Sequence, residues 1–125
     1  MTTPDAGEVV RRFYEAVRKK DLAAASAFLG DDLVFIGLFE TYRGPKEYLA
    51  ALTGLLGITV RLEVKTIVAE REEAAIFFEL ETTAPAAAVT LVAEWHHVTG
   101  GKIRRVQSAF DGRPFAAMFA GKSAR

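Results

Sequence analysis

Several residue types that often define a protein's chemistry are scarce or missing in this sequence. There is no cysteine, which excludes a disulfide framework and a thiolate site, and only two histidines occur, His96 and His97. Sixteen basic residues balance sixteen acidic ones, so no net charge attracts nucleic acid or an anionic membrane. No stretch approaches the roughly 20 consecutive apolar residues of a membrane-spanning helix. We therefore expect a cytoplasmic protein with neither nucleic-acid nor membrane partners.

The chain is long enough to bury one hydrophobic core. It has 125 residues, half of them apolar, which predicts a single domain over residues 1–125 with its core at about 8–119. Three segments of the first half have the apolar spacing and the end signals of helices. They are 9–17 after Thr3-Pro4, 22–29 after Asp21, and the segment between Gly44 and Gly57.

The second half changes to the two-residue period of strands. Apolar residues alternate with polar ones from Ile58 onward, and the alternation returns after Ala84-Pro85-Ala86 and again after Gly100-Gly101. Helices followed by antiparallel strands predict an α+β fold rather than a parallel α/β fold.

Five short motifs accompany this order of elements. They are Arg11-Arg12-Phe13, Lys20-Asp21-Leu22, Gly30-Asp31-Asp32, Tyr42-Arg43-Gly44 and Gly100-Gly101-Lys102-Ile103. Together they resemble the nuclear transport factor 2-like superfamily, and within it the SnoaL-like polyketide cyclases and the ketosteroid isomerases. The resemblance implies a cone-shaped roll of three N-terminal helices on a curved mixed, mainly antiparallel sheet. It also implies an apolar pocket and a homodimer formed through the outer face of the sheet.

The resemblance also implies where isomerase chemistry would lie. Ketosteroid isomerases use a carboxylate base, with a tyrosine and a protonated aspartic acid that donate hydrogen bonds to the developing enolate. When the flanking motifs are kept in register, these three positions are Phe13 for the tyrosine, Gly37 for the base and Ala93 for the acid. None of these side chains transfers a proton, so we expect the isomerase scaffold without its catalytic set.

The turn at residues 99–101 decides which side chains of the preceding strand face the pocket. An even turn places Trp95 and His97 inside and Glu94 and His96 outside, whereas an odd turn exchanges them. We expect the even case, because it gathers the apolar residues on one side. The expected pocket residues are Phe13, Phe35, Phe39, Phe78, Trp95, Val106, Ser108 and Phe110.

His97 and Tyr14 are the candidate catalytic residues. An imidazole titrates near neutral pH, and a phenol donates a hydrogen bond to a ligand oxygen. Each also has a structural interpretation, His97 as a hydrogen-bonded residue at the pocket rim and Tyr14 as a core aromatic. We expect no metal site, because His96 and His97 point to opposite faces of a strand and no further histidine or cysteine exists.

Two kinds of function are compatible with these features. The pocket residues predict the binding of a small apolar ligand, with isomerase-, cyclase- or hydrolase-like acid–base chemistry left open. The alternative is a protein-interaction or dimerisation domain without a ligand. No dinucleotide or phosphate-binding motif occurs, so we expect no cofactor. Whether the protein is an enzyme is not decided by the sequence.

Overall fold

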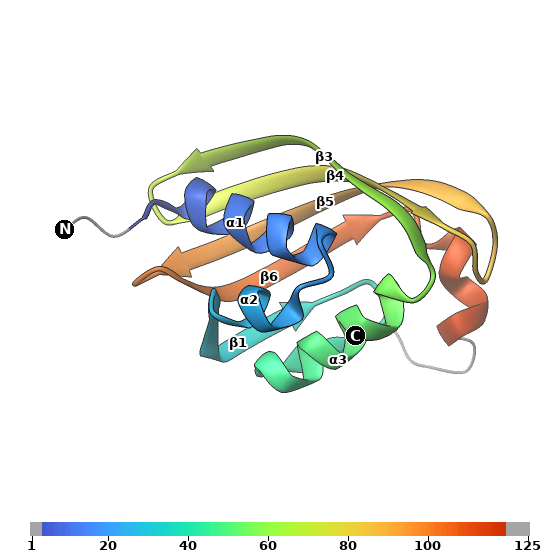
Figure 1. The fold of residues 1–125 in the computed structure, drawn as a ribbon, viewed down its shortest axis with the longest axis horizontal. Helices are drawn as coiled ribbons and strands as arrows, with labels where there is room; N and C mark the ends of the chain where they lie inside the picture. The colour runs from blue at the N-terminus through green and yellow to red at the C-terminus, as the bar shows by residue number, and fades with distance from the viewer. Residues whose placement is uncertain (1–3, 120–125) are drawn as a thin grey trace.

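Six strands form one open sheet, and three helices cover one of its faces (Figure 1). The computed structural model describes residues 4–119. The elements are α1 Ala6–Arg18, α2 Leu22–Ser26, β1 Leu29–Ile36, β2 Thr41–Arg43, α3 Pro45–Leu56, β3 Thr59–Glu70, β4 Glu73–Thr82, β5 Ala88–Thr99, β6 Lys102–Phe110 and the 3-10 helix η1 Arg113–Phe119. The expected α+β class, with helices preceding most of the sheet, is confirmed.

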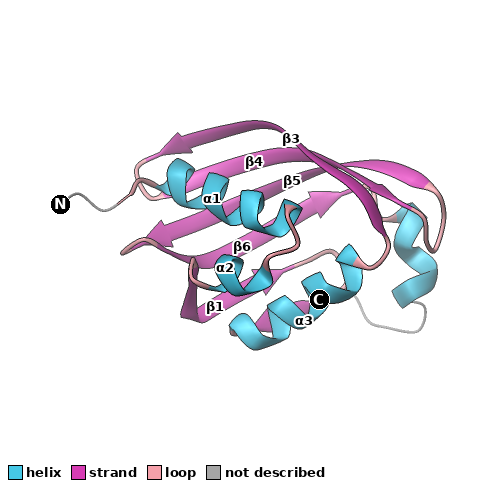
Figure 2. Ribbon diagram, in the orientation of Figure 1, coloured by secondary structure: helices cyan, strands magenta, loops and turns pink. Residues whose placement is uncertain are grey.

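The sheet is mixed but mainly antiparallel, as Figure 2 shows by its strand arrows. The strand order is β2-β1-β6-β5-β4-β3, and only β1 and β6 run parallel. α1 packs across β3 to β6, whereas α3 packs on β1, β2 and β3. The face of the sheet that the helices cover is called the inner face below, and the opposite one the outer face. No helix within residues 4–119 has the length and apolarity needed to cross a membrane.

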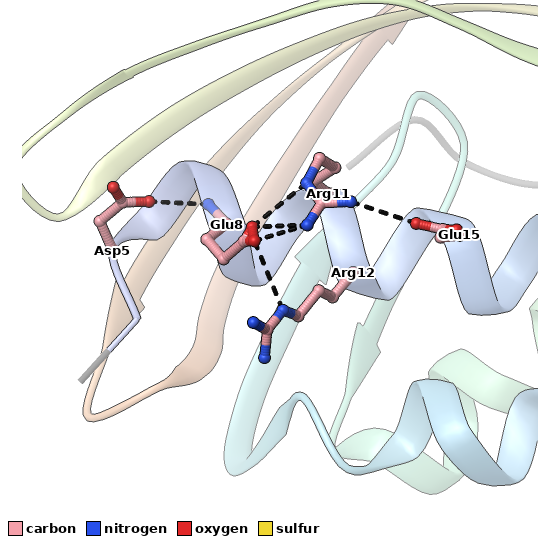
Figure 3. Close-up of polar contacts among 5 residues, drawn as sticks. All are labelled: Asp5, Glu8, Arg11, Arg12 and Glu15. Atoms are coloured by element: carbon pink, nitrogen blue, oxygen red, sulfur yellow. Dashed lines mark hydrogen bonds and ion pairs between the residues drawn. The ribbon is translucent and has the colours of Figure 1, made fainter. Parts of the chain in front are cut away.

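α1 is amphipathic and delivers most of the helical core. Asp5 caps it, accepting a hydrogen bond from the Glu8 backbone N–H at 2.8 Å, and Val10 and Phe13 on its apolar side are fully buried. The solvent side carries ion pairs that join Arg11 to Glu8 and Glu15 (Figure 3). The expected start at Thr3-Pro4 is therefore too early: Pro4 precedes the cap, and Thr3 lies outside the described residues.

The predicted limits are right for α3 and wrong for the C-terminal end of α2. α3 begins at Pro45 after Gly44, whose φ is 86°, and is capped by Gly57, as the sequence predicts. α2 ends at Ser26 rather than near residue 29, because Leu29 already belongs to β1. The Phe28 carbonyl accepts a hydrogen bond from the Ile103 N–H at 2.7 Å, which ties this segment to β6.

The β5–β6 hairpin contains one extra residue. Its turn is even, as expected: Gly100 and Gly101 have φ of 60° and 75°, and Thr99 pairs with Lys102. Arg104, however, has no partner in β5, since Val98 pairs with Ile103 while His97 pairs with Arg105. This β-bulge shifts the register by one residue and reverses the expected faces.

The bulge makes the predicted facing of β5 wrong. Glu94 and His96 are buried on the inner face, whereas Trp95 is 55% exposed and lies with His97 on the outer face. The bulged Arg104 makes two side-chain hydrogen bonds. Its Nε donates to Thr99 Oγ1 at 3.3 Å, and its Nη1 donates to Asp32 Oδ1 at 3.0 Å.

We expect Gly54→Ala to raise the free energy of unfolding by about 0.5–1 kcal/mol, because glycine inside a helix costs conformational entropy. A Cβ at Gly54 in α3 would have no atom within 4 Å, so no clash offsets the gain. Gly100→Ala is the opposite control, since a non-glycine residue in the left-handed region costs about 1–2 kcal/mol. Urea unfolding measures both. A destabilised Gly54→Ala protein would contradict the prediction.

Candidate functional site

A cavity of about 370 Å³ lies between the inner face of the sheet, α3, the segment joining β1 to β2, and η1. This volume is in the range of small-molecule sites. The lining residues are Phe35, Gly37, Leu38, Phe39, Glu40, Tyr42, Tyr48, Ala51, Leu52, Gly54, Leu55, Phe78, Leu80, Val92, Glu94, Ser108, Phe110, Phe115 and Met118. Most are apolar, so burial of apolar surface is the main interaction this cavity offers.

Aromatic rings give the cavity a stiff wall. Phe35 stacks on Tyr48 with ring centroids 4.7 Å apart, and its other neighbour, Tyr42, is 5.9 Å away. At the end of β6, Phe110 meets Phe115 of η1 edge to face at 5.7 Å. Such pairs favour defined relative orientations of the rings that form the wall.

η1 is held against the end of β6 by Asp111. The Arg113 backbone N–H donates to Asp111 Oδ1 at 3.1 Å, and the guanidinium pairs with the same carboxylate. These contacts with Arg113 lower the pKa of Asp111 to about 2. The carboxylate is thus ionised at neutral pH and positions the helix that supplies Phe115 and Met118 to the cavity wall.

Two neighbouring strands of the sheet contribute polar side chains to the cavity, Glu94 of β5 and Ser108 of β6. They pair with each other across the two strands, and Glu94 is 7% exposed. Glu94 Oε1 has no hydrogen-bond partner among the described residues. His96 Nε2 lies 3.8 Å from this oxygen, which is too long for a hydrogen bond. A buried carboxyl oxygen without a partner is costly, and functional sites are where proteins retain such atoms.

Behind Glu94, two further polar groups connect the cavity wall to α1. The Tyr14 hydroxyl lies 3.5 Å from His96 Nε2, and the two rings meet edge to face. His96 is completely buried, and its Nδ1 has no hydrogen-bond partner among the described residues. Tyr14, His96 and Glu94 therefore form a buried row in which Glu94 alone lines the cavity.

Two further polar side chains of the cavity belong to Glu40, in the segment between β1 and β2, and to Tyr42 of β2. Glu40 and Tyr42 both line the cavity, and burial, followed by the nearby Glu40 carboxylate, raises the pKa of Tyr42. Burial alone raises the pKa of Tyr48 well above its ordinary value. Both phenols therefore stay protonated at neutral pH and can donate hydrogen bonds.

The structure brings together only part of the expected pocket. Phe35, Phe39, Phe78, Ser108 and Phe110 line the cavity. Phe13, Tyr14 and Val106 face the same interior but are core residues behind its wall. The prediction that Trp95 and His97 face the cavity is wrong, because the bulge at Arg104 turns both to the outer face.

Trp95 and His97 instead share one partner on the outer face. Glu73 of β4 accepts a hydrogen bond from Trp95 Nε1 at 2.8 Å, and its other oxygen lies 2.5 Å from His97 Nδ1. The contact with His97 is the main cause that lowers the pKa of Glu73. His97 thus has a structural partner on the opposite side of the sheet from the cavity.

None of the three isomerase positions carries a catalytic group, and one of them, Ala93, does not lie on the expected face of the sheet. Phe13 is core, and at Gly37 a Cβ would lie 3.0 Å from the Phe35 ring and 3.1 Å from the Glu40 backbone oxygen. Ala93 lies on the outer face, so that position is not in the cavity at all. The adjacent Glu94 does line the cavity, although the sequence analysis places it on the outer face. A signal existed: Ile103 and Val106 are three residues apart, which breaks the two-residue period where the bulge occurs.

An open mixed sheet with helices and a cavity on its inner face defines the nuclear transport factor 2-like superfamily, as the sequence motifs predict. Residues 10–106 match the model of the SnoaL-like domain, and the chain belongs to this family. A search of curated proteins found no match.

Solved structures share the fold over most of their length. A protein with a cystatin-like fold from Xanthomonas campestris is 16% identical, with a TM-score of 0.83 over 93% of this chain and 98% of that one. An LEH-like epoxide hydrolase from M. tuberculosis is 23% identical, with a TM-score of 0.73 over 91% and 88%. A putative polyketide cyclase from Sinorhizobium meliloti is 14% identical, with a TM-score of 0.74 over 82% and 94%. Identities this low show the fold alone.

We expect Glu94→Leu to raise the free energy of unfolding by about 1–3 kcal/mol in the absence of ligand. The substitution removes a buried carboxyl oxygen that has no partner and replaces it with apolar volume. Thr90→Val is the matched control, because Thr90 Oγ1 is also buried without a partner but does not line the cavity. Thermal and urea unfolding provide the measurement. A clear loss of stability in Glu94→Leu would mean that His96 stabilises the carboxylate as an ion pair.

Proposed function

We propose that this protein binds a small, largely apolar molecule in the cavity, oriented by a polar contact with Glu94. The observation that carries the proposal is the unpartnered carboxyl oxygen of Glu94 at the wall of an aromatic-lined cavity. Sites for small molecules combine apolar walls with a few placed polar groups, and this cavity has that composition.

The cavity volume limits the size of the ligand. At the packing density of protein interiors, about 370 Å³ accommodates on the order of 10–15 non-hydrogen atoms. A ligand of this size that buries about 250 Å² of apolar area gains about 6 kcal/mol at 25 cal/mol per Å². Before association costs, this corresponds to a Kd of tens of micromolar. Burial supplies most of that affinity, and Glu94 supplies orientation.

Any acid–base step in this cavity would fall to Glu94 rather than to His97 or Tyr14. Glu94 lines the cavity, whereas His97 is on the outer face and Tyr14 lies behind the wall. His96 and Tyr14 lie behind Glu94 and contact each other, so neither reaches the ligand directly. Two structural relatives carry the names of enzymes that act on small molecules, which agrees with a ligand-binding role. These relatives share only the fold with this chain, so the proposal is based on the geometry and composition of the cavity.

We expect Ser108→Phe to weaken ligand binding at least tenfold, because the ring occupies the cavity beside Glu94. Gln107→Phe is the matched control: it adds the same ring to the neighbouring residue, on the outer face opposite Trp95. Calorimetric titration with small aromatic and terpenoid ketones, alcohols and amines, beginning with 4-phenylbutan-2-one, measures both. The proposal fails if no probe saturates the parent protein at millimolar concentration, or if Ser108→Phe binds as tightly as the parent.

We further propose that two copies of the chain associate through the outer face of the sheet. Val68, Leu91 and Trp95 expose more than half of their side chains there, around the central Phe77 and Ala93. Acidic and basic residues flank this apolar strip. They are Arg61, Glu63, Lys65, Glu79 and Glu81 at one end and Glu73 and Arg105 at the other. A surface with both signs of charge around an apolar centre can be self-complementary across a two-fold axis.

We expect Leu91→Glu to convert a dimer into a 13.6 kDa monomer at micromolar concentration. A buried carboxylate in the centre of an apolar interface is strongly unfavourable. Ala50→Glu, on the exposed side of α3, adds the same charge away from the outer face and should leave the dimer intact. Sedimentation equilibrium measures the masses. A monomeric parent protein would refute the proposed association.

A further inference from the structure

The cavity lining contains carboxyl groups and no basic group. Among the lining residues that the structure describes, Glu40 and Glu94 carry the carboxyl groups, and there is no lysine, arginine or histidine. They lie on different walls, one in the segment before β2 and the other in β5. A molecule held between these walls therefore meets carboxyl groups from two directions.

Two arginines of the sheet are paired with carboxylates outside the cavity. Arg104 is paired with Asp32, and Arg61 on the outer face is paired with Glu63, Glu79 and Glu81. His96 lies behind Glu94, and its Nε2 is beyond hydrogen-bond distance of Oε1. Glu94 therefore has an acceptor oxygen that no cation of the described chain occupies.

The rest of the lining also favours a cation. Seven aromatic residues line the cavity, and the faces of aromatic rings attract ammonium groups within about 6 Å. Phe35 and Tyr48 are fixed by stacking on each other, so this part of the wall needs no ordering when a ligand binds. Carboxyl groups combined with aromatic walls are complementary to an ammonium ion and repel an anion.

We infer that the ligand of this cavity is a small apolar amine, bound as its ammonium ion with the charged nitrogen at Glu94. This inference depends on the proposed ligand-binding function and specifies the chemical class of the ligand. The ammonium N–H groups donate to the unpartnered Glu94 oxygen, and the aromatic rings enclose the apolar body. Hydrogen bonds between charged groups are about twice as strong as neutral ones. The cavity therefore selects an amine over the alcohol of the same shape, and selects against a carboxylate.

The test uses three ligands with the same body and different head groups. These are 4-phenylbutylamine, 4-phenylbutan-1-ol and 4-phenylbutanoate, titrated calorimetrically at pH 7, where the amine is protonated. We expect the amine to bind the parent protein about tenfold more tightly than the alcohol, and the carboxylate to bind more weakly than either. If the alcohol or the carboxylate binds as tightly as the amine, the inference is wrong while the proposed function stands. If none of the three nor any other probe binds, both are wrong.

Two isosteric variants locate the charge contact. Glu94→Gln should reduce the preference for the amine over the alcohol to about threefold or less, while the alcohol affinity changes little. Glu40→Gln tests the second carboxyl group in the same way and should have the smaller effect. A tenfold preference that survives in both folded variants would overturn the inference, because the cation would then be recognised without either carboxyl group. Circular dichroism establishes that each variant is folded, and the parent titrations decide the outcome even if one is not.

Discussion

One unpaired residue in β6 determines which side chains of β5 reach the interior. Because strand side chains alternate between faces, the insertion of Arg104 places Glu94 and His96 inside and Trp95 and His97 outside. The bulge is held by the contacts of Arg104 with Thr99 and Asp32, which connect the hairpin to β1. The polarity of the cavity wall and the apolarity of the outer face are therefore two results of the same local geometry.

The fold was accessible from the sequence because its signals are strong and mutually consistent. Gly44-Pro45 and Gly57 delimit α3 by backbone preferences that few other residues share, and two glycines with positive φ fix the β5–β6 turn. The limits of an element are harder to predict from the sequence where they depend on tertiary contacts. α2 stops at Ser26 because Phe28 and Leu29 join the sheet, which no local preference of an alanine-rich segment indicates.

Only part of the candidate site could be predicted from the sequence. Phe35, Phe39, Phe78, Ser108 and Phe110 line the cavity as expected. Three of them, Phe35, Phe78 and Phe110, are large apolar residues of the inner face, which hydrophobic periodicity identifies. The β5 residues were assigned from hydrophobicity, since Leu91, Ala93 and Trp95 form an apolar alternation. The real inner row of β5 includes Thr90, Glu94 and His96, which are polar and buried. Hydrophobic periodicity fails where a protein buries polar groups on one face of a strand and leaves apolar ones on the other, as functional and contact surfaces require.

The position of Trp95 determines what the protein's intrinsic fluorescence reports. It is the sole tryptophan, its indole N–H is bound to Glu73, and the whole thickness of the sheet separates it from the cavity. Its emission is therefore a probe of the solvent and contacts at the outer face, and of the charge state of the Glu73 carboxylate. Tryptophan fluorescence therefore reports on the outer face of the sheet separately from the cavity on the inner face.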